Sequence, residues 1–404
     1  MVNVIGLGYI GLPTALMLAS HGIQVVGTDY NTQLVEQLRS GKTTFQEKGL
    51  PELFASAQEG GICFTPQYQS VDTYIIAVPT PYDPVSKRVD PVYLVRAMES
   101  VLDVCPENAV VIVESTVSPG TIDSYLRPML QNMMSQKGKH IHLAHAPERI
   151  IPGNMIHELL HNNRTIGADD PVIAEQVRRL YASFCLGNIA LTDIRTAEMT
   201  KVVENTYRAV NIAFANELAR ICADAQLDVY EIIRICNMHP RVNILQPGPG
   251  VGGHCISVDP WFLVGDYPDL ARVIGEAMKT NENMPLYVLD KIKSIMSAHG
   301  ITDPARVRLY GLAYKENVDD CRESPTLQLL QKQDLGYPLK VYDPMVRTDL
   351  VPNQYHDLDT FLEEVDLVVL LAGHDEIRRN MDKLREKIVL DTRNICANPG
   401  VYRL

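Results

Sequence analysis

A glycine-rich run near the start of the chain has the spacing of a nucleotide-binding turn. Residues Gly6–Gly11 read Gly-Leu-Gly-Tyr-Ile-Gly and lie between an apolar run, Val2–Ile5, and an expected helix, Gly11–Gly22. Glycines at this spacing allow a tight turn and bring a helix N-terminus up to a pyrophosphate. Asp29, eighteen residues after Gly11, ends the next apolar run, where a carboxylate accepts hydrogen bonds from ribose hydroxyls and repels a 2′-phosphate. The pattern predicts NAD rather than NADP; a turn that binds nothing and an FAD site are the alternatives.

A second glycine-rich run ends in a cysteine. Residues 246–260 read Gln-Pro-Gly-Pro-Gly-Val-Gly-Gly-His-Cys-Ile-Ser-Val-Asp-Pro, which places Cys255 next to His254 and four residues before Asp259. So much glycine allows the backbone to wrap a ligand. A cysteine beside a nicotinamide could attack an aldehyde and hold it as a thiohemiacetal; a second hydride transfer would give a thioester, which water cleaves to an acid. The alternative is a small buried apolar residue, which is what we expect of the other seven cysteines.

Three polar residues have the spacing of one helical face. Lys201, Asn205 and Arg208 follow one another at intervals of four and three residues. From the spacing alone, a charged stripe that faces solvent is the expected outcome.

The elements that must position these groups alternate, in the first half of the chain, between β-branched runs and helical stretches, as in α/β proteins. Three of the expected strands end in small polar clusters, at residues 79–81, 115–116 and 146–149. Ligands of open α/β sheets bind beyond the carboxyl ends of the strands, so these clusters are candidate site segments. Strands are expected at Val2–Ile5, Gln24–Asp29, Thr73–Val78, Ala109–Glu114 and His140–His145.

The composition changes near Asp193. From Ala197 to about Gly300 the pattern is helical, apart from an irregular insertion at Asn237–Asp259 that is rich in glycine, proline and histidine. A second α/β unit follows, so the order along the chain is α/β, helical, α/β. Its strands are expected at Val307–Gly311, Leu339–Asp343, Leu367–Leu371 and Ile388–Asp391, and a helix at Pro325–Gln331.

Composition narrows the class of protein further. At 404 residues the chain exceeds one ordinary domain, and no apolar run approaches the ~20 residues that cross a bilayer. The start carries no basic segment of a signal peptide, and the eight cysteines form no CxxC pair or zinc pattern, so we expect a reducing cytoplasm and no metal. The formal charge of −12 argues against nucleic-acid or anionic-membrane partners, and an anionic substrate would need locally gathered cations.

Several motifs occur in the order found in one known family, and the chain resembles the UDP-glucose/GDP-mannose dehydrogenase family over its full length. The resemblance implies two Rossmann-like doubly wound domains joined by a helical one: residues 1–192 for NAD, 193–300 for dimerisation and catalysis, and 301–404 for the UDP-sugar. The motifs are Gly6–Gly11, Val78–Pro81, Glu114–Thr116, Ala146–Arg149, Lys201 with Asn205, Gly252–Cys255, Gly311–Lys315 and Asp320–Ser324.

The same resemblance implies catalytic roles. Cys255 is the nucleophile, and Lys201 and Asn205 lie beside the reacting carbon, where an ammonium and an amide stabilise an oxyanion and lysine exchanges a proton. Glu148 serves thioester hydrolysis, and Asp259 holds the catalytic water. A local cap or turn role remains the alternative for both acids.

It also implies binding roles, and a homodimer in which the loop carrying Arg241 crosses the interface. A role in ending a strand is the alternative for Thr80 and Thr116, and a position at the surface is the alternative for Arg393. The implied NAD contacts are Gly6, Gly8, Tyr9, Ile10, Gly11, Asp29, Thr80, Thr116 and Arg322. The implied substrate contacts are Arg149, Ile150, Lys201, Asn205, Arg208, His239, Arg241, Gly252, Tyr314, Lys315 and Arg393.

Within the family, the runs Asn237–Asn243 and Pro247–Cys255 resemble the branch that oxidises UDP-N-acetyl-D-mannosamine at C6 to the uronate, with two NAD⁺, for bacterial surface polysaccharides. UDP-N-acetylglucosamine, UDP-glucose and GDP-mannose stay open as substrates. Two other classes stay open as well: a non-catalytic nucleotide-sugar-binding protein, because fold alone does not imply activity, and a two-electron β-hydroxyacid dehydrogenase.

Overall fold

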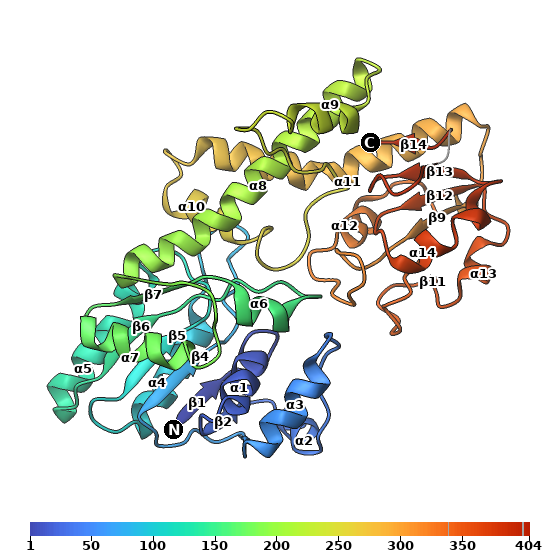
Figure 1. Cartoon of the computed structure of the whole chain (residues 1–404). Helices are drawn as coiled ribbons and strands as arrows, with labels where there is room; N and C mark the ends of the chain where they lie inside the picture. Colours follow the sequence, from blue (N-terminus) through green and yellow to red (C-terminus); the bar gives the residue numbers. More distant parts are fainter. Residues whose placement is uncertain (338, 398–399) are drawn as a thin grey trace. The chain divides into compact units, whose positions relative to one another are not determined.

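The computed structural model describes residues 1–337, 339–397 and 400–404. The chain divides into two compact units, Met1–Glu204 and Asn205–Leu404, each built on a mainly parallel sheet (Figure 1). A 31-residue helix, α8 (Ile194–Asp224), contains the point of division. The predicted fold class, two Rossmann-like α/β domains joined by helices, is confirmed. The predicted limits of three domains stay a prediction.

The first unit is built on an eight-stranded sheet of order β3-β2-β1-β4-β5-β6-β7-β8. Neighbouring strands run parallel, except that β7 is antiparallel to β6. The chain order reverses where β1 pairs with β4, and ligands of open α/β sheets bind in the crevice at such a reversal. The strands are β1 (Val2–Ile5), β2 (Val25–Thr28), β3 (Cys63–Thr65), β4 (Thr73–Ile76), β5 (Val110–Val113), β6 (His142–His145), β7 (Arg164–Ala168) and β8 (Ile189–Thr192).

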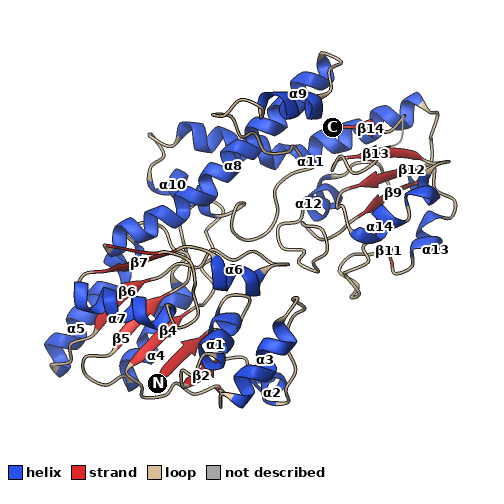
Figure 2. Cartoon of the chain, in the orientation of Figure 1, coloured by secondary structure: helices blue, strands red, loops and turns tan. Residues whose placement is uncertain are grey.

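Helices cover both faces of this sheet (Figure 2). Alternate strand residues supply the two cores: Ile75 of β4 packs in one with helices α1, α3 and α7, and Ile76 packs in the other with α4. Burial on both faces explains why the central strands are almost continuously apolar. The helices are α1 (Gly11–Ser20), α2 (Thr32–Arg39), α3 (Leu50–Glu59), α4 (Val92–Val104), a π-helical turn η1 (Ile122–Leu126), α5 (Arg127–Lys137), α6 (Met155–His161) and α7 (Pro171–Tyr181).

The second unit contains a six-stranded parallel sheet of order β11-β10-β9-β12-β13-β14, which repeats the order of the first six strands of the other sheet. The strands are β9 (Val307–Tyr310), β10 (Lys340–Tyr342), β11 (Gln354–Tyr355), β12 (Leu367–Leu370), β13 (Ile388–Asp391) and β14 (Tyr402–Arg403). The accompanying helices are η2 (Pro304–Arg306), α12 (Pro325–Lys332), α13 (Leu358–Leu362), α14 (Asp375–Arg379) and η3 (Met381–Leu384).

Three further helices follow α8: α9 (Val229–Cys236), α10 (Asp259–Asp266) and α11 (Arg272–Ala298). Met284, Val288 and Ile292 of α11 enter the core that lies against the second sheet. The segment between α9 and α10 is irregular, as its glycine and proline content predicts. It carries Cys255 at its end.

The structure contains several strands that the sequence did not predict. Strands β3, β7, β8, β11 and β14 are absent from the predicted set: β3, β11 and β14 are short, β7 contains Arg164 and Gly167, and β8 is partly exposed. None of these has the uninterrupted apolar run that marks a strand buried on both faces. Among residues 1–337, 339–397 and 400–404, no helix has the length and apolar character that a bilayer span requires.

Candidate active site

The predicted nucleotide-binding turn joins β1 to α1. Gly6 has φ +86°, and a Cβ there would lie 2.6 Å from the carbonyl oxygen of Ala77. A Cβ at Gly11 would lie 1.9 Å from the carbonyl oxygen of Gly6, whereas a Cβ at Gly8 would meet nothing within 4 Å. The outer two glycines are therefore needed for the turn itself. Gly8 leaves open space beside its backbone, which fits the close approach of a pyrophosphate.

The carboxylate of Asp29 ties the end of β2 to this turn. Its Oδ2 accepts the backbone N–H of Leu7 at 2.9 Å, and its Oδ1 accepts that of Asn31 at 2.9 Å. Each carboxylate oxygen can accept a second hydrogen bond, so the half-buried Asp29 can still receive the ribose hydroxyls of NAD. Within the turn, the ring of Tyr9 stacks on Phe45 with centroids 4.4 Å apart.

Two threonines predicted to contact NAD lie together beyond the carboxyl ends of β4 and β5. The hydroxyl of Thr80 donates to the carbonyl oxygen of Thr116 at 2.6 Å, and Thr80 is buried. Neighbouring strands of a parallel sheet bring their following loops to the same edge. The two residues thus join loops 36 positions apart, and their contact with the cofactor stays a prediction.

We expect Gly8→Ala to fold like the parent and to bind NAD⁺ at least ~10-fold more weakly, because only the ligand would meet the added methyl. Isothermal titration with NAD⁺ and a thermal melt would measure both effects. Gly22→Ala is the matched control: that site also has nothing within 4 Å but lies at the far end of α1, and its positive φ makes it cost stability rather than affinity. Unchanged NAD⁺ affinity in Gly8→Ala would contradict the assignment of this turn.

Glu148 lies in the loop after β6 and takes part in a buried ion-pair cluster. Its Oε1 accepts the backbone N–H of Arg149 at 2.6 Å, and its Oε2 pairs with Nη2 of Arg164. Nη1 of Arg164 lies 3.6 Å from Oε1 of Glu114, which also accepts the hydroxyl of Tyr181 at 3.0 Å. The bond to Arg149 fits the local role left open for Glu148, but the pair with Arg164 links it to β7. Sequence reasoning missed Arg164 because β7 was not predicted.

Burial controls the protonation of two groups around this cluster. Burial, and then repulsion by Glu148, raise the pKa of Glu114 to about 7, against the opposing effect of Arg164. Burial lowers the pKa of His145 to about 4, so this histidine is neutral and its Nδ1–H donates to the carbonyl oxygen of Val113 at 2.9 Å. Neutral His145 and protonated Glu114 are the forms that a low-dielectric interior favours.

Arg149 and Ile150 follow Glu148, and both have contacts inside the first unit. The guanidinium of Arg149 donates to the carbonyl oxygen of Asn163 at 2.7 Å and lies 2.6 Å from the carboxylate of Glu204 on α8. Ile150 packs in the core of the first unit. The backbone of Ile150, rather than its side chain, is therefore the part available to a ligand.

The second unit brings Asn205, Cys255 and Asp259 together. Asp259 begins α10, and its backbone N–H donates to the carbonyl oxygen of Cys255 at 2.8 Å. The Nδ2 of Asn205 donates to Oδ2 of Asp259 at 2.6 Å, and both side chains are buried. Cys255 is exposed, so the alternative of a small buried apolar residue is wrong for it. The same expectation is also wrong for Cys63, because β3 is an edge strand that begins at the surface.

The glycines before Cys255 pack against the loop that follows β9. A Cβ at Gly252 would lie 2.5 Å from Cβ of Tyr314, and one at Gly253, where φ is +80°, would lie 2.9 Å from the Tyr314 ring. The N–H of Gly253 donates to the carbonyl oxygen of Arg322 at 2.8 Å. The cysteine segment is thereby fixed to two motifs that lie about 60 and 70 residues later in the sequence.

Arg393 contacts Tyr314 and lies close to Gly248 in the glycine-rich segment before Cys255. Its Nε donates to the carbonyl oxygen of Leu371 at 2.8 Å and its Nη2 to that of Tyr314 at 3.2 Å. Its Nη1 would be 3.1 Å from a Cβ at Gly248. Burial lowers the pKa of this guanidinium, which is therefore not a simple surface arginine. Its substrate contact stays a prediction.

The remaining predicted cations differ in how they are held. Arg322 is clamped by Asp320, with Nη2–Oδ2 at 2.6 Å, and Lys315 is half-buried. His239 and Arg241 are exposed in the loop after α9, where the N–H of Arg241 donates to Nδ1 of His239 at 3.3 Å.

Lys201 and Arg208 lie on α8, as predicted. Lys201 is only 5% exposed, so the expectation of a solvated stripe is wrong for it. Arg208 is half-buried, and it lies in the second unit whereas Lys201 lies in the first.

A second glycine turn, in the C-terminal sheet, shows why only one of the two turns suits a dinucleotide. Gly311 has φ +99° after β9, and the N–H groups of Leu312 and Ala313 donate to Oδ2 of Asp343 at 2.7 and 2.8 Å. His374 lies 3.1 Å from the same oxygen and, with the backbone donors, lowers the pKa of Asp343 against the effect of burial. Asp343 is fully buried and saturated with donors, so it cannot reach a ribose as Asp29 can.

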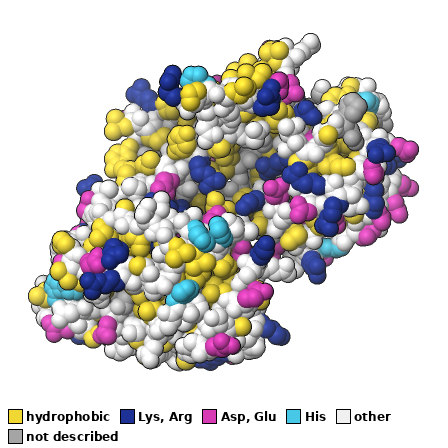
Figure 3. All heavy atoms as spheres, in the orientation of Figure 1, with side chains coloured by type: hydrophobic (Ala, Val, Ile, Leu, Met, Phe, Trp, Pro, Cys, Tyr) yellow, Lys and Arg dark blue, Asp and Glu magenta, His cyan; other side chains and the backbone are white. Residues whose placement is uncertain are grey.

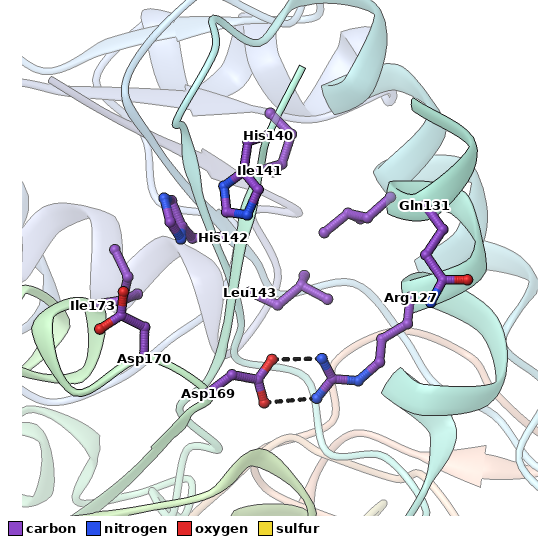
Figure 4. A pocket seen from close by; sticks show the side chains of 10 residues that line it. Arg127, Gln131, His140, Ile141, His142, Leu143, Asp169, Asp170 and Ile173 are labelled. Carbon is purple, nitrogen blue, oxygen red and sulfur yellow. Dashed lines mark hydrogen bonds and ion pairs between the residues drawn. The ribbon is translucent and has the colours of Figure 1, made fainter. Parts of the chain in front are cut away.

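The first unit contains a cavity of about 340 Å³ that none of these residues lines (Figure 4). It opens at the start of β6 and the end of β7, which is the sheet edge opposite the glycine turn. Two of its charged side chains pair with each other, with Nη2 of Arg127 at 2.8 Å from Oδ1 of Asp169, and Asp170 caps α7. The lining residues include Arg127, Gln131, His140, His142, Asp169 and Asp170.

The fold and the open glycine turn are those of an NAD-binding Rossmann-like protein with a second Rossmann-like domain. The chain belongs to the UDP-glucose/GDP-mannose dehydrogenase family. The NAD binding domain of that family matches residues 1–185, its central domain residues 195–283 and its UDP binding domain residues 308–398. The predicted family, the NAD cofactor and the activity of a nucleotide-sugar dehydrogenase are confirmed, and the β-hydroxyacid dehydrogenase and non-catalytic alternatives are set aside.

Two relatives and one solved structure illustrate the similarity. The chain is 44% identical to UDP-N-acetyl-D-mannosamine dehydrogenase of Methanocaldococcus jannaschii, over 98% of this chain and 92% of that protein. It is 41% identical to NDP-N-acetyl-D-galactosaminuronic acid dehydrogenase of Ralstonia nicotianae, over 98% and 96%. The native structure of UDP-N-acetyl-mannosamine dehydrogenase from Staphylococcus aureus is 39% identical, with a TM-score of 0.88 over 100% of this chain and 97% of that one.

Proposed function

We propose that the chain oxidises UDP-N-acetyl-D-mannosamine at C6 to UDP-N-acetyl-D-mannosaminuronate. The reaction removes four electrons, consumes two NAD⁺ and adds one water. The observation that carries this substrate is the full-length similarity to relatives named for it, at up to 44% identity. The runs 237–243 and 247–255 support the same branch. The Ralstonia relative makes the N-acetylgalactosamine nucleotide the second candidate.

Cys255 is the proposed nucleophile. Its exposed thiol can add to the C6 aldehyde carbon to form a thiohemiacetal, whose oxidation leaves a thioester. NAD⁺, when bound, supplies the hydride acceptor for both oxidations. Lys201 takes the proton of the C6 hydroxyl, and the amide of Asn205 donates to the developing oxyanion.

The thioester is then cleaved by water. Water oxygen bonds to the acyl carbon, the carbon–sulfur bond breaks and its electron pair returns to the sulfur of Cys255, which releases the acid. Glu148 takes the proton from the water, and Asp259 holds the water in place. The bond from Asn205 fixes the orientation of the Asp259 carboxylate, which supports a positional role for it.

Cations are proposed to hold the diphosphate and the sugar carboxylate formed during the reaction. The planar, multidentate guanidinium suits both groups, which explains the choice of arginine at most of these positions. Tyr314 and Gly252 are proposed to line the same substrate site, since they pack against each other. The proposed substrate cations are Arg149, Arg208, Arg241, Lys315 and Arg393, with Ile150 and His239 as further contacts.

The proposed enzyme is a homodimer that pairs through α8. Tyr207, Phe214 and Ile221 recur at intervals of seven on one face of this helix and are 62, 52 and 55% exposed. Hydrophobic side chains also gather over α8 and α9 on the face shown in Figure 3. Such a stripe on a long helix is typical of a self-association surface. The exposed loop with Arg241 is proposed to cross this interface, and equilibrium sedimentation at micromolar concentration would reveal a monomer if the proposal is wrong.

The stoichiometry of the purified enzyme tests the proposed reaction. We expect about two NADH for each UDP-N-acetyl-D-mannosamine consumed, because alcohol and aldehyde oxidation each release one hydride. NADH absorbance and chromatography of the nucleotide sugars measure this ratio. A ratio of one would leave only an alcohol dehydrogenase.

A substrate panel tests the choice of sugar. We expect kcat/KM for UDP-N-acetyl-D-mannosamine to exceed that for UDP-glucose by ~100-fold or more, since a site built for an N-acetyl group leaves its polar atoms unpaired with a hydroxyl analogue. The panel also contains UDP-N-acetylglucosamine, UDP-N-acetylgalactosamine and GDP-mannose. Preference for any of them would replace the proposed substrate. The expected aminouronic acid product is proposed to enter surface polysaccharides.

A further inference from the structure

Two carboxylates share one guanidinium in the interior of the first unit. The side chains of Arg164, Glu148 and Glu114 are 5, 4 and 0% exposed. Arg164 pairs directly with Glu148 and approaches Glu114 only to 3.6 Å. The guanidinium also lies over the ring of Tyr181, with its central carbon 4.5 Å from the ring centroid. Glu114 directly follows β5, Glu148 lies in the loop after β6 and Arg164 begins β7, so three neighbouring strands of the sheet hold the charged groups in one place.

The charges of this cluster cannot all be compensated at once. Burial opposes the charge of Arg164, yet attraction by Glu148 and then Glu114 raises its pKa above the usual range. One cation balances one carboxylate, so the interior favours a proton on the second. The shorter contact assigns the cation to Glu148, and the pKa of about 7 assigns the proton to Glu114. The other titratable group against Glu114 is Tyr181 of α7, whose hydroxyl donates to it and whose pKa burial raises well above its usual value.

We propose that Arg164 and Glu114 are positioning residues for Glu148 in the cleavage of the Cys255 thioester. This inference rests on the proposed function. Arg164 holds Oε2 of Glu148, and the N–H of Arg149 holds Oε1, which leaves one lone pair on each oxygen to take a proton from the attacking water. Neither positioning residue touches the substrate in this scheme.

Glu114 sets how strongly Arg164 neutralises Glu148. When Glu114 loses its proton, Arg164 is shared between two carboxylates and Glu148 becomes a stronger base. Thioester cleavage should therefore accelerate as the pH rises through 7, whereas formation of the thioester has no reason to follow Glu114. In this step the hydroxyl of water bonds to the acyl carbon and its proton goes to Glu148. The carbon–sulfur bond breaks, and sulfur leaves with the bonding electron pair.

Three variants separate the steps in a rapid-quench experiment with UDP-N-acetyl-D-mannosamine and excess NAD⁺. The burst of NADH reports formation of the thioester, and intact-protein mass spectrometry reports the acyl-enzyme that awaits cleavage. In Glu148→Gln, we expect the acyl-enzyme to accumulate after a normal burst. Arg164→Lys keeps the positive charge but loses the planar guanidinium that contacts both carboxylates. We expect thioester cleavage in this variant to slow ~10-fold or more, while the burst rate stays within ~3-fold of that of the parent. In Glu114→Gln, we expect the rise in cleavage rate between pH 6 and 8 to disappear.

Arg308→Lys is the matched control for replacing a buried arginine. Arg308 is also 5% exposed, but it donates to the carbonyl oxygens of Thr360 and Phe361 in the second unit and pairs with no carboxylate in the part of the chain that the structure describes. Its replacement should lower thermal stability without changing the cleavage rate. This comparison separates a loss of packing from a loss of positioning.

The outcomes distinguish the inference from the function on which it rests. Equal slowing of burst and cleavage in Arg164→Lys, or an unchanged pH profile of cleavage in Glu114→Gln, would overturn the inference while Glu148→Gln still accumulates acyl-enzyme. Absence of acyl-enzyme in every form, Glu148→Gln included, would overturn the thioester route and the inference with it. If Arg164→Lys does not fold, the pH profile of thioester cleavage in the nearly isosteric Glu114→Gln variant tests the proposed positioning role by itself.

Discussion

Replacing Cys255 with serine is expected to lower the rate of uronic acid formation by ~10³-fold or more, because an unactivated hydroxyl is a far weaker nucleophile than a thiol. The aldehyde would then have no covalent anchor, and no thioester could form. At most one NADH per sugar should appear. Chromatographic measurement of the acid, together with NADH absorbance, gives both values for the parent and the variant.

Cys63→Ser is the control for this prediction. Cys63 is also exposed but lies on β3, at the edge of the first sheet, and no proposed role involves it. We expect its rate to equal that of the parent within twofold. A Cys255→Ser enzyme that still releases acid at a near-normal rate would refute covalent catalysis by this residue.

Replacing Lys201 with methionine should lower kcat by ~10²–10³-fold, the usual effect of removing one group that stabilises an oxyanion. The same change should raise the melting temperature. Lys201 is 5% exposed, and among residues 1–337, 339–397 and 400–404 its ammonium forms no ion pair, so burial of its charge is not compensated. Methionine fills a similar volume without charge. Opposite effects on activity and stability are the mark of a residue kept for function.

Lys291→Met serves as the comparison for Lys201. Lys291 is half-buried on α11, donates to the carbonyl oxygen of Arg403 at 2.7 Å, and burial lowers its pKa. Its loss removes a hydrogen bond without any expected effect on kcat. Steady-state kinetics and thermal melts of both variants provide the test. A Lys201→Met enzyme with kcat within threefold of the parent would exclude the proposed role.

Features set by neighbouring residues could be predicted from the chain directly. The glycine turn, the acid at the end of β2 and the buried parallel strands were all recognisable, because glycine spacing and apolar runs act over a few residues. The irregular segment before Cys255 was likewise evident from its glycine and proline content. The antiparallel course of β7 was not, since strand direction depends on packing rather than on composition.

Contacts between distant segments were decided by the tertiary structure alone. The bond between Asn205 and Asp259 spans 54 positions, and that between Arg393 and Tyr314 spans 79. Resemblance named these residues but gave no reason for them to meet. Folding of the loops onto one another supplies that reason, because the cysteine segment has no side chains at Gly252 and Gly253 that would keep Tyr314 away.

The sequence by itself identified Gly6–Gly11 as the predicted NAD-binding turn, and it marked Cys255 as the residue most suited to covalent chemistry. Only the tertiary structure decided the charge states around Glu148. A glutamate has the same intrinsic acidity wherever it stands in a sequence, and Glu114 and Arg164 acquire their effect only when the sheet buries them together away from water.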